Sequence, residues 1–144
     1  DYTAAGPQAP TAVPDTLRAA TAAAPDADRL VRLLSEWFAE LQPRLAPLMR
    51  TIQEGAAVAP EVDALEKARA EQRFLNYHEA ARAFAARADS KPMKTPEAAA
   101  LIWTVGHPSI YRFLVMDQGW TLPRYQHWIE SILRAALVEE PPGA

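Results

Sequence analysis

Apolar residues recur at helical spacing along most of this chain, and the pattern is clearest near the carboxyl end. Three or four residues separate most of the apolar positions of the last segment, which are Tyr125, Trp128, Ile129, Ile132, Leu133, Ala136 and Leu137. This spacing predicts one helix with a continuous apolar stripe, preceded by Thr121 as its N-cap. A terminal helix with so large a stripe needs a large partner surface. A second subunit is one source of that surface, and packing within the same chain is the alternative.

The same spacing predicts two long helices upstream. The first begins after Asp26 as N-cap and runs to about Glu54, where Gly55 is a stop signal. Its prolines at positions 43 and 47 predict a bend or a break near residues 41–44, because each proline removes a backbone donor. The second helix begins at Pro60 and runs to about Ala88.

Shorter helices follow a loop at 89–94. Thr95 as cap and Pro96 at the first position predict a helix that ends near Val105. Pro108 predicts a new helix over 109–116, which Gly119 terminates in the left-handed conformation. The sequence therefore predicts an all-α protein, a multi-helix bundle of five to six helices without strands.

The two ends of the chain differ from the middle. Residues 1–25 are rich in alanine and proline and predict a linker or tether with no core of its own, in which only 15–24 has the pattern of a short helix. Residues 26–138 are predicted to form one α-helical domain, and residues 139–144 a disordered tail.

Composition narrows the class of protein. The hydrophobic content of 49%, only 5 glycines and the lack of β-branched runs favour helices over strands. A net charge of −3 gives no electrostatic case for this chain binding nucleic acid or anionic lipid by itself. The chain has no cysteine, no apolar run long enough to span a membrane and no secretory signal, so we expect a cytoplasmic protein. The alanine, arginine and proline content fits a bacterial genome rich in G and C.

Two stretches carry a resemblance to a known family. They are the segment HPSIYRFLV at 107–115, followed by GWTLPRY at 119–125 with Trp128 and Ile129, and the segment WFAELQPRLAPL at 37–48. In this order they resemble the C-terminal region of TetR-type transcriptional regulators, over roughly residues 26–138. The resemblance implies an effector-binding and dimerisation domain. The family's helix-turn-helix domain precedes this region, and residues 1–25 are too short and too proline-rich to supply it, so DNA binding would need a domain that these residues do not include.

The resemblance also implies a homodimer in which the last two helices of each subunit form a four-helix interface. The candidate interface residues are Tyr111, Leu114, Tyr125, Trp128, Ile129, Ile132 and Leu133. The alternative, packing within the chain, applies to the same residues.

A helical bundle senses a small molecule by enclosing it between helices. Candidate ligand-binding residues on the middle helices are Trp37, Phe38, Leu41, Met49, Phe74, Tyr77, His78, Phe84 and Trp103. Each of these is also an ordinary core residue in the alternative interpretation. The set predicts a small hydrophobic effector, whereas a buried arginine such as Arg82 would favour an anion.

The sequence contains no residue pattern typical of a catalytic site. The histidines at 78, 107 and 127 have no partner histidine at helical spacing, so we expect no metal site and no cofactor. His107 is expected to hydrogen-bond a free carbonyl at the helix junction. The pairs Glu36 with Glu40 and Arg69 with Arg73 predict solvated outer faces. We therefore expect a ligand sensor rather than an enzyme, with a stand-alone scaffold domain or a carrier of hydrophobic metabolites as alternatives.

Overall fold

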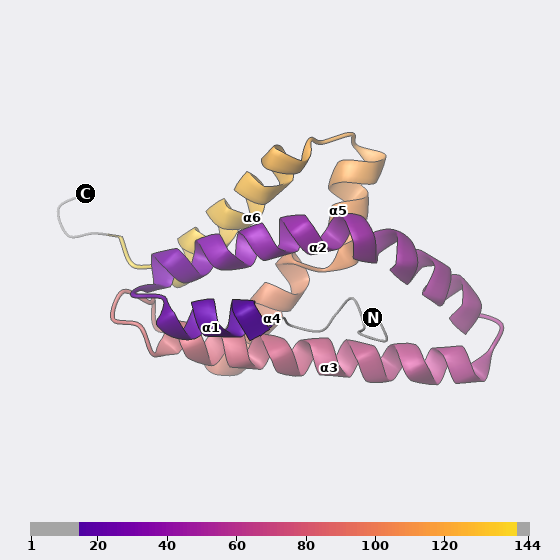
Figure 1. The fold of residues 1–144 in the computed structure, drawn as a ribbon, viewed down its shortest axis with the longest axis horizontal. Coiled ribbons are helices and arrows are strands. Elements are labelled where there is room, and N and C mark those ends of the chain that lie inside the picture. Colours follow the sequence, from indigo (N-terminus) through magenta and orange to yellow (C-terminus); the bar gives the residue numbers. More distant parts are fainter. Residues whose placement is uncertain (1–14, 141–144) are drawn as a thin grey trace.

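The computed structural model describes residues 15–140 of the 144-residue chain. It confirms an all-α, multi-helix bundle, with no strand in the part of the chain that it describes (Figure 1). The predicted tail at 139–144 lies mostly outside the described residues. In chain order the elements are α1 (Asp15–Ala23), α2 (Ala27–Ala56), α3 (Pro60–Ala85), α4 (Thr95–Val105), α5 (Pro108–Tyr111), the π-helix η1 (Arg112–Asp117) and α6 (Leu122–Leu137).

Helix α2 organises the fold. Figure 1 shows α3 along one side of α2 and α6 along the other, and α2 packs against both. The predicted cap at Asp26 is confirmed, since its side chain accepts the backbone N–H of Arg29 at 2.8 Å. Both internal prolines stay inside one helix, which curves in its second half (Figure 1) rather than breaking. Gly55 is not the stop signal that we predicted, because it lies within the last turn and the helix ends at Ala56.

The core is built mainly from α2, α3, α4 and α6. Leu30, Phe38 and Leu45 of α2 are fully buried, and so are Tyr125 and Ile129 of α6. Burial of such large apolar side chains supplies the dominant favourable free energy for folding. The stripe predicted on the last helix is therefore used first of all inside the chain.

The junction of α4 and α5 depends on a glycine. Gly106 lies against the ring of Phe38, so that a Cβ atom built on it would overlap the ring. The helix predicted over 109–116 is only partly correct, because after α5 the backbone continues as a π-helix. Gly119 ends this segment at φ 74°, as the sequence predicts. Thr121 caps α6 by accepting the N–H of Arg124 at 3.3 Å.

Helix α1 packs on α2 and α3 and is more than part of a tether. The guanidinium of Arg87 donates to the carbonyl oxygens of Thr21 at 2.7 Å and Ala24 at 3.0 Å. Ala24 belongs to the main hydrophobic core. The short helix predicted within 15–24 is therefore present as α1, and it also contacts the core, whereas residues 1–14 of the predicted linker lie outside the described part. Among residues 15–140, none of the helices combines the length and the apolar character that crossing a membrane requires.

Candidate ligand-binding site

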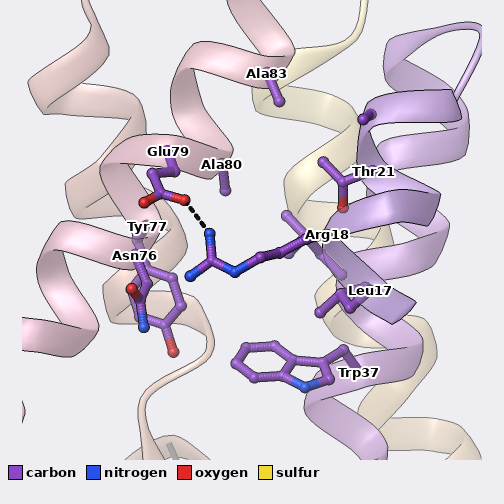
Figure 2. Close-up of a pocket in the computed structure, with 11 residues that line it drawn as sticks. Leu17, Arg18, Thr21, Trp37, Asn76, Tyr77, Glu79, Ala80 and Ala83 are labelled. Carbon is purple, nitrogen blue, oxygen red and sulfur yellow. Dashed lines mark hydrogen bonds and ion pairs between the residues drawn. The ribbon is translucent and has the colours of Figure 1, made fainter. Parts of the chain in front are cut away.

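A pocket of about 290 Å³ lies between α1, α2 and α3 (Figure 2). Its volume is near the lower end of the range for small-molecule sites, about 300–1,000 Å³. Its wall is mostly apolar, with a few polar groups at its edge. The lining residues are Leu17, Arg18, Thr21, Ala22, Leu34, Trp37, Asn76, Tyr77, Glu79, Ala80 and Ala83.

Helix α1 forms one wall of this pocket without being buried itself. None of its residues is buried, whereas Leu34 and Tyr77, which also line the pocket, are. Figure 2 shows Arg18 reaching across the pocket toward Glu79, with the indole of Trp37 on the neighbouring wall. The Arg18 to Glu79 ion pair is 2.6 Å long, but both side chains are about half exposed. Such an exposed pair contributes about 0–1 kcal/mol, so α1 is held weakly on this side.

A larger hollow of about 800 Å³ opens near the start of α2 and the end of α6. Charged groups, including Asp28, Asp89, Lys91 and Arg134, line it. Several of them already have partners: Arg134 pairs with Asp28 at 2.7 Å, and Asp89 accepts the N–H of Ala27 at 2.7 Å. This hollow is an open ionic edge, and the pocket beneath α1 is the better candidate for a hydrophobic ligand.

The nine predicted ligand-binding residues are not gathered in one chamber. Trp37 and Tyr77 line the pocket. Four others are buried in the core, as the alternative interpretation without ligand binding predicts: Phe38, Leu41, Met49 and Phe84. Phe74, His78 and Trp103 are partly buried and stack edge to face, with ring centroids 4.6 Å apart for Phe74 and His78 and 6.2 Å for Phe74 and Trp103. Ligand binding by any of the nine stays a prediction.

The arginines of α3 differ from the prediction in which of them is buried. Arg73, which we expected on a solvated face, is only 3% exposed, whereas Arg82 is exposed. The spacing did contain the signal: Arg73 precedes Tyr77, Ala81 and Phe84 by four, eight and eleven residues, and all three are buried. An arginine on the apolar stripe of a helix is buried together with its stripe.

His107 also differs from the expectation. Its Nδ1 atom accepts the backbone N–H of Ser109 at 3.0 Å, so it caps α5 instead of donating to a free carbonyl. Burial lowers the pKa of His107, the charge of Arg73 lowers it further, and the carboxylate of Glu66 partly opposes them. The ring is therefore held neutral near pH 7, with its proton on Nε2 because Nδ1 is an acceptor.

Buried hydroxyls and amides near α2 and α6 complete the polar interior. Burial raises the pKa of both Tyr77 and Tyr125, so each phenol stays protonated. The Tyr125 hydroxyl has no hydrogen-bond partner, and neither has Oε1 of Gln42. The amide nitrogen of Gln42 donates to the carbonyl oxygen of Gly106 at 2.7 Å, which ties α2 to the α4–α5 junction.

The seven predicted interface residues fall into two groups. Tyr125, Ile129 and Leu133 are inaccessible in the single chain, and Tyr111 is 8% exposed. These four side chains pack within the chain, which is the alternative to an interface, because a buried side chain has no accessible surface left for a second copy to contact. Leu114, Trp128 and Ile132 are partly buried. Near them lie the exposed side chains of Phe113, Met116 and Leu122, which the sequence analysis missed.

Comparisons of this chain with protein-family models, curated proteins and solved structures find no match. The assignment of a function therefore depends on the sequence pattern and the geometry alone.

Proposed function

We propose that this chain is the ligand-sensing and dimerisation part of a TetR-like transcriptional regulator that binds a small hydrophobic effector. The observation that carries the proposal is the pocket beneath α1, whose apolar wall includes Trp37 and Tyr77. The exposed Arg18 to Glu79 ion pair, which holds α1 only weakly on the pocket side, supports it further. A ligand that fills the pocket adds contacts between α1 and the two long helices, and so favours the arrangement in which α1 is docked.

A neutral fluorescent probe, N-phenyl-1-naphthylamine, tests the pocket. Its emission rises when it enters an apolar site, and we expect saturable binding to the native protein. Ala80→Leu should abolish binding, because Ala80 lines the pocket and the larger side chain fills it. Ala100→Leu is the matched control, since Ala100 is exposed on α4 and lies outside the pocket. Equal binding by the Ala80→Leu and Ala100→Leu variants contradicts the proposed site.

The same probe is expected to stabilise the fold. A ligand at a hundredfold excess over its dissociation constant adds about 2.7 kcal/mol when it binds only the folded state. The midpoint of thermal unfolding should therefore rise with probe concentration for the native chain and not for Ala80→Leu. A carrier protein shares this behaviour, so dimerisation must be tested as well.

The proposed homodimer uses η1 and the outer edge of α6. Phe113 and Met116 are each 46% exposed, more than such side chains are in a typical interior, and exposed apolar groups on adjacent elements are a common feature of interfaces. Met116→Lys should convert a dimer into a monomer in sedimentation equilibrium at high micromolar concentration. Leu75→Lys, at an exposed position of α3, should leave the dimer intact. A native chain that is already monomeric refutes the dimer.

A further inference from the structure

A second, separate site is suggested by the buried guanidinium of Arg73. Among residues 15–140 it is the one charged side chain that is fully buried, with 4% of its side chain exposed. An arginine keeps its charge at any physiological pH and carries five N–H donors, so burial demands acceptors. Arg73 does not line the pocket beneath α1.

The acceptors that Arg73 has are few and poor. Its Nη2 atom faces Oε1 of Glu66 at 3.4 Å, which is long for a charge-assisted hydrogen bond, usually about 2.7–2.9 Å. Its Nη1 atom faces only the thioether sulfur of Met49 at 3.9 Å, a weak acceptor. Its Nε atom has no partner. The site therefore holds a positive charge with unused donors.

Trp103 of α4 and His107 at the start of α5 carry further N–H groups. The indole ring of Trp103 stacks edge to face on the ring of His107, with centroids 5.3 Å apart, and Nε1 of Trp103 is buried without a partner. Nε2 of His107 carries its proton, because Nδ1 accepts the N–H of Ser109. The charge of Arg73 is one of the causes that lower the pKa of His107. A buried cation whose own N–H groups lack good acceptors is suited to bind an anion.

A small hollow borders Met49, which contacts Arg73. This hollow of about 10 Å³, room for roughly one water molecule, lies in the seam between α2 and α5. Arg50 and Arg112 also line it, so two more positive charges border the hollow. Met49 contacts Arg73, and its unbranched side chain can change shape at little cost.

We propose that Arg73 binds the carboxylate of a small organic acid, which displaces Glu66. Glu66 marks the place of the ligand: its side chain is 20% exposed, so it can turn to water when another carboxylate takes over the guanidinium. The planar fork of an arginine fits a carboxylate with two parallel hydrogen bonds, which makes a carboxylate the favoured anion.

Chemical rescue tests the site directly. Glu66→Ala removes the equivalent of acetate from the side chain and leaves Arg73 without its carboxylate. We expect millimolar sodium acetate to raise the unfolding temperature of this variant more than sodium chloride at equal ionic strength, and more than acetamide. The rise should disappear in the Glu66→Ala/Arg73→Met double variant. Glu71→Ala, an exposed acid on the same helix, is the matched control and should not respond.

A second measurement covers the case in which Glu66→Ala does not fold. In the native chain, titration with acetate should shift the NMR resonance of the Arg73 Nε–H and leave that of the exposed Arg82 unchanged. A response to acetate that equals the response to chloride, or that is the same at Arg73 and Arg82, overturns the proposal. Because these tests use neither the pocket beneath α1 nor its probe, they can fail or succeed independently of the proposed sensing function.

Discussion

Replacing Gly106 with alanine tests whether the α4–α5 junction depends on close approach of the Phe38 ring. A Cβ atom at position 106 would lie 2.6 Å from Cε2 of Phe38 and closer still to Cζ and Cε1. Carbon atoms pack at about 3.5–4.0 Å, so the ring must move by about 1 Å. Gly106 has φ −89° and ψ 5°, which alanine adopts without strain, so the effect comes from the overlap alone.

The surroundings of Phe38 decide the size of the effect. The ring is 0% exposed and is held between Trp37, 5.3 Å away, and Tyr77, 5.9 Å away, as measured between ring centroids. Overpacking such a site costs about 1–3 kcal/mol, and we expect Gly106→Ala to cost about 2 kcal/mol. For a domain of this size that corresponds to a loss of roughly 6–8 °C in the unfolding midpoint.

Circular dichroism with urea and heat measures this loss, and two variants make it decisive. In Gly55→Ala the new Cβ would lie 3.4 Å from Cγ1 of Val62, which is a tolerable contact, so stability should stay the same or rise with the better helix propensity of alanine. In Phe38→Leu/Gly106→Ala the smaller side chain makes room. The cost of the pair should then be less than the sum of the two single costs, by about 0.5–3 kcal/mol. Additive costs, or a Gly106→Ala variant as stable as the native chain, refute the reasoning.

Three further outcomes follow from polar groups. Asp89→Ala should cost about 1 kcal/mol in urea unfolding, because the carboxylate caps α2 by accepting the N–H groups of Ala27 and Asp28; Asp89→Ala with native stability contradicts this role. Tyr125→Phe should keep or raise the free energy of unfolding, because it removes a buried hydroxyl without a partner, and a loss above about 1 kcal/mol means that the hydroxyl is bonded. The pKa of His107 is lowered from its ordinary 6.5, so the unfolded chain binds a proton that the folded chain resists. The stability linked to His107 is present above pH 6.5 and is lost as the pH falls below it. His107→Asn keeps a capping residue and should flatten the dependence of the free energy of unfolding on pH between neutral pH and pH 5. An unchanged pH dependence rules out the linkage.

The features that the sequence predicts correctly are those set by near neighbours. The caps at Asp26 and Thr121 accept N–H groups three residues ahead, and the left-handed Gly119 follows directly from the turn that it ends. The carboxylate of Asp89 caps the same helix as Asp26 from 62 residues away, and no local pattern announces it. The π-helix after Tyr111 is equally hard to predict from the sequence, because nothing in the residue types distinguishes its wider turn from an α-helix.

The candidate sites are harder to predict, because they depend on residues that are far apart in the sequence. Trp37 and Tyr77 are aromatic residues of the middle helices, and both line the pocket. Helix α1, which closes that pocket, lies in a segment whose alanine and proline content predicts a linker with only a short helix. The charge of Arg73 predicts a solvated side chain, whereas its spacing from Tyr77 predicts a place on the buried stripe, and the structure follows the spacing.

The stripe of the last helix shows how far a periodic pattern determines packing. At about 100° per residue, Ile129 and Leu133 lie roughly 40° and 80° to one side of Tyr125, and Trp128 lies roughly 60° to the other side. The first three residues are 0% exposed against the chain's own core, which includes α2, whereas Trp128 is partly exposed beside Trp120. A stripe this wide can serve two partners, one on each edge. The number of apolar residues therefore does not decide between a core helix and an interface helix. A second copy that contacted this stripe would find only its Trp128 edge free, because the other edge is already occupied.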